Sequence, residues 1–558
     1  MHVNVAAMSG KPEALAGPAE SNREAQQPWW QRAVVYQIYP WSFMDSNGDG
    51  IGDLEGIRGQ LDYLVWLGVD AIWISPIYPS PMADFGYDVS NYCDVDPRFG
   101  SLSQFDALLS EAHARGLRVI VDFIPNHTSD QHPWFIESSS SRTSPRRDWY
   151  VWRDSAVGGG APSNWLSEFG GSAWQWHART GQFYYHAFLK EQPDLNWHNP
   201  EVRAAMADVL RFWLARGVDG FRVDAIHHVF KDEALRDNPP NPDYRVGMSP
   251  HRQVLRRFTT DLPEVQDAVR EMRAVLAPYA DRVLIGEAWL PFERLMVYYG
   301  DKLDCFHLPF NFHLISAPWQ ATALRQLIGR YEGLLPPGAW PNWVLGNHDR
   351  SRLASRLGPA QACVAAVLLC TLRGTPTLYY GDELGMCNVP IPPEAVRDPY
   401  EKNVPGLGLG RDPERTPMQW SGAPHAGFSQ TTPWLPVADD FREKNVAAQR
   451  EVEGSMLSLY RALLALRRSL PSLSLGSYEA LDTGEGVLGY VRRLGSSQNT
   501  VLLNLTSESQ SLVLPAPIEG GKILLSTHPR RTGRSVGTAL LADEAVILDI
   551  ASEACAAA

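Results

Sequence analysis

Short apolar runs and longer amphipathic segments alternate along most of the chain. The short runs are rich in Val, Ile and aromatic residues, as buried strands are; they lie at 33–39, 71–76, 118–124, 218–224, 282–285, 305–310, 343–345 and 375–380. The longer segments place apolar residues at helical spacing, at 57–67, 101–115, 201–215, 262–276, 320–331, 360–372 and 456–470. Strands that alternate with helices form parallel sheets. Eight such strands predict an α/β fold, a (β/α)8 TIM barrel.

Two stretches interrupt this alternation. Residues 128–196 carry Ser-rich and Gly-rich turns and many Trp, which predicts a small inserted domain after the third strand. From residue 475 the pattern changes to short alternating runs, which predict an all-β, sandwich-like domain over 475–558. The barrel is then formed by residues 29–127 and 197–474. Residues 1–28 lack a periodic apolar pattern, so we expect a disordered tail there.

Composition restricts the class of protein and its partners. With 44% hydrophobic and 20% charged residues, the chain of 558 residues has the balance of a soluble globular protein. A formal net charge of −13 argues against nucleic acid or an anionic membrane as the main partner. The chain has no apolar run long enough to span a membrane and no secretory signal pattern. Its six cysteines form no CxxC pair, so we expect a reduced, cytoplasmic protein. A monomer and a homodimer are both compatible with the sequence.

The loop after the first expected strand has the pattern D-x-N-x-D-G-x-G-D. Oxygen-bearing side chains at alternate positions, with glycines that allow the turn, are typical of sites for hard cations. An EF-hand would require Glu where Gly56 stands, so the loop is of another type. We expect a structural Ca²⁺ (or Mg²⁺); the alternative is an Asx-rich turn without metal. The candidate ligands are Asp45, Asn47, Asp49 and Asp53.

The fourth expected strand ends in a charged pair. Arg222 and Asp224 are two positions apart, so they point to the same face of a strand. A charged pair on a buried strand is costly unless each partner offsets the other. Two interpretations are open: a structural ion pair, or a carboxylate kept ionised by arginine and directed at substrate from the carboxyl end of the strand.

Other expected strands also end in polar residues, and their combination favours the second interpretation. They are Asp122 and His127, Glu287, and His348 with Asp349. In a barrel of this type the carboxyl ends of the strands carry the active site. Carboxylates grouped with an arginine and histidines suit glycoside hydrolysis, in which one acid attacks the sugar carbon and another protonates the leaving oxygen. Asp224 beside Arg222 suits the first task, and Glu287, with apolar neighbours, the second.

Several separate segments resemble glycoside hydrolase family 13, the α-amylase family. The matching segments are 122–127, 220–224, 287–289 and 347–349, and segments 192–196 and 411–420 resemble signatures of the oligo-1,6-glucosidase-like subfamilies. The resemblance runs from about Trp29 to the end of the chain.

The resemblance implies a retaining mechanism and a role for each matched residue. Asp224 would form the covalent glucosyl intermediate, Glu287 would act as acid and then base, and Asp349 would bind the 2- and 3-hydroxyls. Three further residues, His127, Arg222 and His348, would support charge and orientation. The others would bind the sugar: Asp84 and Arg411 close the −1 subsite, Tyr87 stacks under the ring, and Phe188 and Gln192 line the wall. The resemblance also adds Ile51 to the metal ligands.

A closed pocket implies exo action on a terminal glucose. Ala225 follows the expected nucleophile. The resemblance implies Val at this position in relatives that prefer α-1,6 links, and Ala or Thr in those that prefer α-1,4 links. The physical reason is that a β-branched residue narrows the wall near the +1 sugar. We therefore predict an α-glucosidase that acts on maltose and short maltooligosaccharides, with sucrose as a further substrate and with transglucosylation. The alternatives within the family are an oligo-1,6-glucosidase, a sucrose isomerase and a trehalose synthase. A non-catalytic transporter heavy chain is disfavoured, because such proteins have a membrane span and usually lack the complete acid trio.

Overall fold

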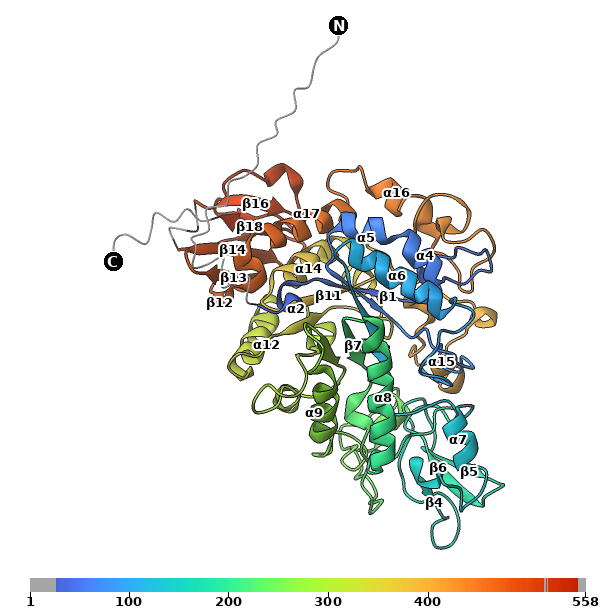
Figure 1. Ribbon diagram of the computed structural model, residues 1–558. Coiled ribbons are helices and arrows are strands. Elements are labelled where there is room, and N and C mark those ends of the chain that lie inside the picture. The colour runs from blue at the N-terminus through green and yellow to red at the C-terminus, as the bar shows by residue number, and fades with distance from the viewer. Residues whose placement is uncertain (1–26, 516–517, 519, 550–558) are drawn as a thin grey trace.

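The computed structural model describes residues 27–515, 518 and 520–549. The expected disordered tail, residues 1–28, lies outside the described residues except for its last two. Within the described part, the chain forms a central barrel with an insertion at one end and an antiparallel sheet at the other (Figure 1).

Eight parallel strands form one sheet in the order β10-β11-β1-β2-β3-β7-β8-β9. A parallel bridge between Asn311, just after β9, and Trp343 of β10 joins the two ends of the sheet. The sheet is therefore closed, and the predicted (β/α)8 barrel is confirmed. The strands are β1 Val35–Ile38, β2 Ala71–Ile74, β3 Arg118–Phe123, β7 Gly220–Val223, β8 Val283–Gly286, β9 Leu308–Pro309, β10 Asn342–Val344 and β11 Thr375–Tyr379.

Helices surround the strands and cover the outer face of the barrel. The longer ones are α6 Leu102–Ala114, α8 Pro200–Arg216, α9 Val265–Leu276, α12 Ala321–Leu334, α14 Pro359–Thr371 and α17 Met456–Ser469. The shorter ones are α2 Trp29–Arg32, α3 Pro40–Phe43, α4 Leu54–Gly59, α5 Leu61–Leu67, α10 Phe292–Val297, α11 His313–Ser316, α13 Leu353–Leu357, α15 Pro399–Asn403, α16 Val446–Gln449 and α18 Pro471–Leu475. The single helix expected over 57–67 is wrong: it is two helices, α4 and α5, separated at Gln60, which follows the weak helix former Gly59.

Both faces of the barrel strands are buried, which explains their continuous apolar runs. Successive residues of β1 and β2 alternate between two clusters. Val35 and Trp73 belong to a cluster with residues from other barrel strands, whereas Tyr36 and Ile72 belong to the large cluster that includes the helices. A barrel interior and a helix-covered outer face account for this alternation.

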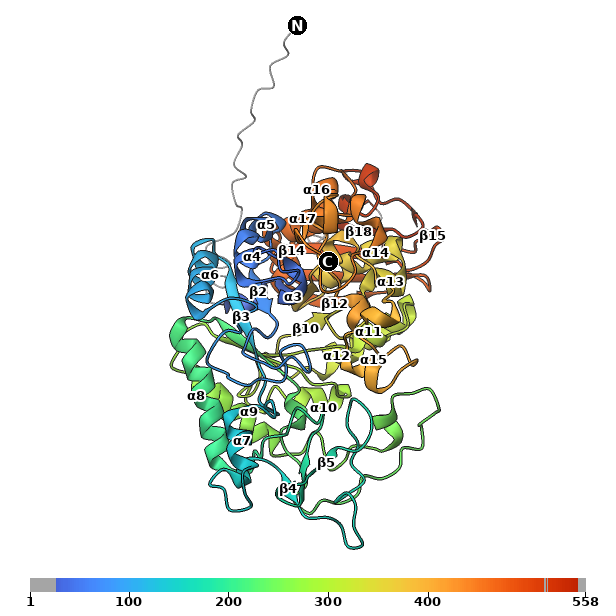
Figure 2. The same ribbon diagram turned by 90° about the vertical axis from the view of Figure 1, so that its right-hand side faces the viewer.

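The insertion between β3 and α8 contains α7 Pro133–Ser138 and a three-stranded antiparallel sheet of β4 Trp152–Arg153, β6 Gln182–Tyr185 and β5 Trp174–His177. Bridges from His127 to Asp194 and from Tyr150 to Leu195 bring the start and end of this insertion together. Figure 2 shows α7, β4 and β5 at the same end of the molecule as α8 and α10.

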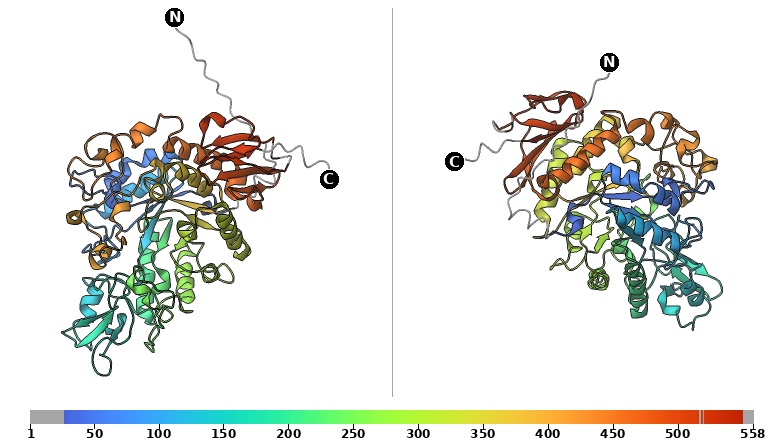
Figure 3. Two further views of the ribbon diagram at one scale, coloured as in Figure 1. Left: turned by 180° about the vertical axis from the view of Figure 1, so that it is seen from behind. Right: turned by 45° about the horizontal axis from the view of Figure 1, so that its top comes forward.

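The C-terminal part forms a five-stranded antiparallel sheet, β12-β13-β14-β18-β16, and a separate two-stranded sheet, β15-β17. Figure 3 shows the larger sheet at the end of the barrel opposite the insertion, in both further views. It packs against α12, α14 and α18. The strands are β12 Ser477–Leu481, β13 Val487–Leu494, β14 Ser497–Asn504, β15 Gln510–Ser511, β16 Lys522–Ser526, β17 Ala539–Leu540 and β18 Ala545–Asp549.

Candidate active site

A cavity of about 1390 Å³ opens at the carboxyl ends of the barrel strands. Every expected catalytic and substrate residue lines it except Gln192 and Arg222, which are buried behind its wall. The lining residues from the expected set are Asp84, Tyr87, His127, Phe188, Asp224, Glu287, His348, Asp349 and Arg411. They lie in segments that follow β2, β3, β7, β8, β10 and β11, and they meet here because the strands are parallel and their carboxyl ends share one edge.

Arg222 joins three carboxylates from neighbouring strands. Its Nη1 donates to Asp122 Oδ1 at 2.7 Å and to Asp224 Oδ1 at 2.8 Å, and its Nη2 donates to Glu287 Oε2 at 2.5 Å. The strand register explains the cluster, since Asp122 of β3 lies directly beside Arg222 of β7, and Glu287 follows β8 on the other side. Asp224 and Glu287 therefore lie next to each other, one on each terminal nitrogen of the same guanidinium.

The charge balance of this cluster differs from the expectation that Arg222 keeps Asp224 ionised. Burial raises the pKa of Asp224, Arg222 lowers it, and the nearby Glu287 and Asp122 raise it further. The resulting pKa lies well above the usual range for aspartate. One guanidinium cannot neutralise three carboxylates, so the cluster holds a proton more tightly than isolated carboxylates do.

Asp349 lies in the opposite electrostatic environment. Burial alone would raise its pKa, but Arg411 and Arg415 outweigh burial and hold the pKa below the usual range. Arg415 Nη2 lies 2.9 Å from Asp349 Oδ1, and Arg411 Nη1 lies 3.3 Å from the same oxygen. The ionised carboxylate is thus ready to accept hydrogen bonds from hydroxyl groups. Sequence reasoning missed Arg415, although it lies four positions after Arg411 within the segment 411–420.

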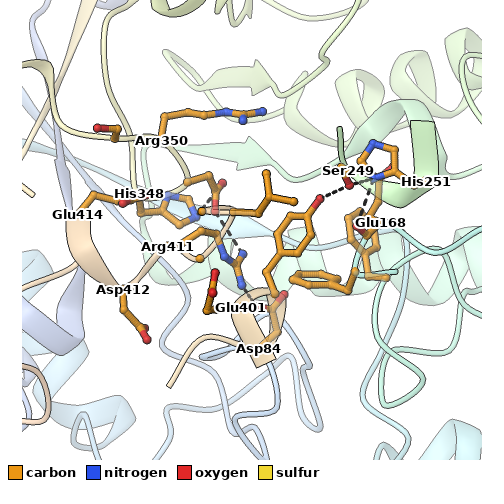
Figure 4. Close-up of a pocket in the computed structure, with 18 of the residues that line it drawn as sticks. Asp84, Glu168, Ser249, His251, His348, Arg350, Glu401, Arg411, Asp412 and Glu414 are labelled. Atoms are coloured by element: carbon orange, nitrogen blue, oxygen red, sulfur yellow. Dashed lines mark hydrogen bonds and ion pairs between the residues drawn. The ribbon is translucent and has the colours of Figure 1, made fainter. Parts of the chain in front are cut away.

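Arg411 lies at one side of the cavity, where it forms ion pairs with two acids (Figure 4). Its Nη2 lies 2.6 Å from Asp84 Oδ1, as predicted, and also 2.6 Å from Asp398 Oδ1. Burial raises the pKa of Asp398, but Arg411 outweighs it, and the pKa is lowered. For Asp84 burial dominates over Arg411, and the pKa is raised. Sequence reasoning missed Asp398, which lies in a long irregular loop without any motif.

The two expected histidines, His127 and His348, are buried and do not provide the charge that was predicted for them. Burial lowers the pKa of His127 to about 4 and holds that of His348 well below its usual range. Both rings are therefore neutral near pH 7, so they orient groups by hydrogen bonding and do not supply positive charge. His348 stacks on Tyr87, with ring planes 3° apart, and its Nε2 lies 2.7 Å from the Tyr87 hydroxyl. Gln192 Nε2 contacts His127 Nε2 at 3.1 Å.

A second polar cluster lies on the other side of the same cavity and was not predicted. Glu168, from the insertion, contacts the Arg256 guanidinium, and its Oε2 lies 3.3 Å from His251 Nδ1. Ser249 Oγ joins His251 Nδ1 at 2.9 Å and the Tyr400 hydroxyl at 2.6 Å. Figure 4 shows Glu168, Ser249 and His251 across the cavity from Asp84 and Arg411. Three loops, from the insertion, after β7 and after β11, are thus joined at the rim.

The candidate metal loop is curled by its own side chains. Asp45 Oδ1 accepts from the backbone N–H of Gly48 at 2.7 Å, and Asn47 Oδ1 from that of Asp49 at 2.9 Å. Asp49 Oδ1 accepts from Ile51 N at 2.8 Å, and Asp53 caps α4 through Gly56 N. Among the residues that the structure describes, no group of three or more His, Cys, Asp and Glu side chains is arranged to hold a metal ion. These hydrogen bonds shape a loop whose oxygens are of the hard type that Ca²⁺ prefers.

A closed (β/α)8 barrel with an acid cluster at the carboxyl ends of its strands defines the class of barrel glycoside hydrolases. The family model "Alpha amylase, catalytic domain" matches residues 37–476. The chain therefore belongs to the α-amylase family, glycoside hydrolase family 13, and is a glycoside hydrolase that acts on α-glucosides.

Individual relatives agree with this assignment. A "Probable alpha-glucosidase" of Rhizobium meliloti is 43% identical over 89% of this chain and 94% of its own. An "Oligo-1,6-glucosidase" of Parageobacillus thermoglucosidasius is 38% identical over 88% and 92%. Among solved structures, the "alpha-glucosyl transfer enzyme, XgtA" has a TM-score of 0.89 and 42% identity, over 94% of this chain and 100% of that one. The trehalulose synthase MutB of Pseudomonas mesoacidophila has a TM-score of 0.86 and 34% identity, over 94% and 100%.

No helix in the described part of the chain is long and apolar enough to cross a lipid bilayer.

Proposed function

We propose that the protein is a retaining, exo-acting α-glucosidase that releases terminal glucose from maltose and short maltooligosaccharides. The observation that carries this proposal is the position of Arg411, held between Asp84 and Asp398 beside Asp349. A side chain fixed on two buried acids walls off one end of the cavity. A sugar chain that continued beyond the reacting glucose would meet this wall, so the pocket favours a non-reducing end.

The retaining mechanism assigns the chemistry to two acids. In the reactive form the proton that the cluster holds is on Glu287, and Asp224 is ionised. An Asp224 oxygen attacks the anomeric carbon while Glu287 gives this proton to the leaving oxygen, and the bond between that oxygen and the carbon breaks. Glu287 then takes a proton from water as the water oxygen replaces Asp224 on the carbon. Retaining enzymes place the two carboxyl groups about 5–5.5 Å apart. The binding of both acids to one Arg222 guanidinium supports such a spacing.

The remaining residues bind and orient the glucose ring. We assign Asp349 to the 2- and 3-hydroxyls, because two arginines keep its carboxylate ionised. Tyr87, stacked on His348, offers a rigid aromatic surface to the ring. His127, fixed by Gln192, is a neutral donor or acceptor beside Phe188.

Linkage preference is proposed from the residue after Asp224. Ala225 has φ of 41° and ψ of 36°, the left-handed region in which β-branched residues are strongly disfavoured. The small side chain leaves the wall near the +1 sugar open, which supports α-1,4 over α-1,6 links. The relatives include both an α-glucosidase and an oligo-1,6-glucosidase.

Transfer or isomerisation is the second candidate function. The similarity to an α-glucosyl transfer enzyme and to a trehalulose synthase favours it, and the same acids would serve. Initial rates on maltose, isomaltose, sucrose, trehalose and soluble starch, with products separated by chromatography, distinguish the candidates. Glucose released from maltose first as the α-anomer, with little activity on starch, is the expected result. An isomerised disaccharide as the main product from sucrose would instead establish the second candidate.

Two further assignments accompany this function. We place the enzyme in the cytoplasm, where the five free cysteines of the described residues would stay reduced. We also propose that the loop around Asp45 binds a structural Ca²⁺, with side-chain oxygens of Asp45, Asn47, Asp49 and Asp53 and the backbone of Ile51 as ligands. The loop contributes nothing to the cavity lining, so the ion would act on stability alone.

A further inference from the structure

Trp289 lies two residues after Glu287, on the loop that leaves β8. Its indole Nε1 donates a hydrogen bond to Glu287 Oε1 at 3.0 Å. The other carboxylate oxygen, Oε2, accepts from Arg222 Nη2 at 2.5 Å and from the backbone N–H of Ala225 at 3.1 Å. The two oxygens of Glu287 therefore have different partners. Arg222 and the Ala225 N–H bind Oε2, and the indole of Trp289 binds Oε1.

The indole itself is fixed by two residues from other strand ends. Its ring stacks on Phe312, with centroids 4.0 Å apart and planes 5° apart. The Arg350 guanidinium lies over the ring, 4.4 Å from its centroid. Phe312 follows β9 and is buried, and Arg350 directly follows Asp349 after β10. Trp289 thus connects the loop that carries Glu287 to the loop that carries Asp349.

We infer that Trp289 is a positioning residue for Glu287, and that Arg350 and Phe312 hold its indole in the required orientation. This inference rests on the proposed role of Glu287 as acid and base. The indole N–H occupies one lone-pair direction of Oε1 and leaves the other for the glycosidic oxygen or the water.

The hydrogen bond acts at both steps of the reaction. When the Oε1 proton moves to the leaving oxygen, negative charge develops on the Glu287 carboxylate, and the indole N–H stabilises this charge without changing position. In the second step the same N–H keeps Oε1 directed at the water whose proton it accepts. A substrate whose leaving group needs no proton depends on this arrangement only in the second step.

An alternative role for Trp289 is a flat surface for the second sugar, because the residue lines the cavity. The two roles predict different kinetics. A sugar-binding surface acts on the KM of maltose, whereas a positioning residue acts on proton transfer, and so on kcat/KM according to the leaving group.

The test is Trp289→Phe, which keeps an aromatic ring against Phe312 and removes the N–H donor. We expect kcat/KM for maltose to fall about 10- to 100-fold, and that for an aryl α-glucoside with a good leaving group to fall less than about threefold. We also expect the high-pH limb of the maltose profile to move to higher pH, because a donor that stabilises the ionised carboxylate is lost. Arg350→Gln, which leaves the N–H in place but frees the ring, should show a smaller loss in the same direction.

Trp319→Phe is the matched control, because its indole donates to Gln361 Oε1 at 2.7 Å, outside the cavity. It should leave both substrates and the pH profile unchanged. If Trp289→Phe fails to fold, 3-benzothienyl-alanine at position 289 keeps the shape of the indole and removes only the N–H.

Equal losses on both substrates with an unchanged pH profile would overturn the inference, as would a change confined to the KM of maltose. Failure of the proposed function looks different. In that case Glu287→Gln would itself keep the turnover of maltose, or the wild-type enzyme would release no glucose from any α-glucoside.

Discussion

Asp398 Oδ1 lies 2.6 Å from Arg411 Nη2, and the Asp398 side chain is completely buried. This pair fixes the arginine that closes the cavity, although Asp398 itself is absent from the cavity lining. It shows that the pocket wall depends on a buried residue outside the recognisable motifs.

Asp398→Asn should therefore affect both stability and binding. The neutral amide leaves the buried Arg411 with less compensation, and removal of one partner from a buried ion pair costs about 3 kcal/mol. We expect the free energy of unfolding to fall by about that amount and the KM for maltose to rise. Denaturant unfolding and initial rates measure the two effects. The control is Asp439→Asn, at an exposed position. Equal stability of the two variants would contradict the prediction.

Asp224→Asn should separate activity from stability. Loss of the proposed nucleophile should reduce kcat by about 10⁴-fold or more. Stability should instead rise, by about 1 kcal/mol, because the substitution removes one carboxylate from a cluster in which three share one guanidinium. Thermal unfolding and maltose turnover check both parts. A variant that kept a tenth of the activity, or that melted at a lower temperature, would contradict the assignment.

The fold and the central acids could be predicted from the sequence because both follow from local rules. Alternating strands and helices predict a barrel, and a parallel barrel gathers Asp224, Glu287 and Asp349 at one edge. Asp398, which contacts Arg411, and Glu168, which lines the cavity, could not be predicted, since they lie in irregular segments whose course depends on tertiary packing. The sharing of Arg222 among three acids also required the register of neighbouring strands, which the sequence pattern does not specify.

Acid should destabilise the fold through buried neutral histidines. His132 caps α7, where its Nδ1 accepts the backbone N–H of Trp134 at 3.1 Å, and burial lowers its pKa to about 3. An unfolded histidine has a pKa of about 6.5, so the unfolded state takes up the proton first as the pH falls. Stability is therefore complete above about pH 6.5 and decreases toward pH 3, by about 2 kcal/mol at pH 5 for this one group.

His132→Asn tests this origin, because Asn is a good N-cap that does not titrate. At pH 7.5 the variant should melt close to the wild type. Between pH 6.5 and 5 its melting temperature should fall less than that of the wild type. Parallel pH dependences for the two proteins would show that His132 does not contribute.

Chelation should distinguish a calcium loop from a turn stabilised only by its own hydrogen bonds. If the loop around Asp45 binds Ca²⁺, EDTA should lower the melting temperature by about 3 °C or more, and added Ca²⁺ should restore it. Activity at moderate temperature should not change, since the loop does not contact the cavity. Asp49→Ala should lower the melting temperature in Ca²⁺ and abolish the response to EDTA. An unchanged transition in the wild type would establish the turn without metal.

Glu168 should control how tightly the second sugar is held. It contacts Arg256 and His251 and so connects the insertion to the loop after β7, on the side of the cavity opposite Arg411. Glu168→Gln keeps the size of the side chain but leaves the Arg256 guanidinium without its partner. We expect the KM for maltose to rise about tenfold, because small displacements of positioning groups have large kinetic effects. The contacts to the reacting glucose are unaffected, so kcat/KM for an aryl α-glucoside should stay nearly constant.

Glu137→Gln is the control for Glu168→Gln. It removes a comparable ion pair, to Arg146 at 2.7 Å, outside the cavity, and should change neither the KM for maltose nor kcat/KM for the aryl α-glucoside. If Glu168→Gln affected both substrates equally, Glu168 would instead stabilise the whole active site and not the binding of the second sugar.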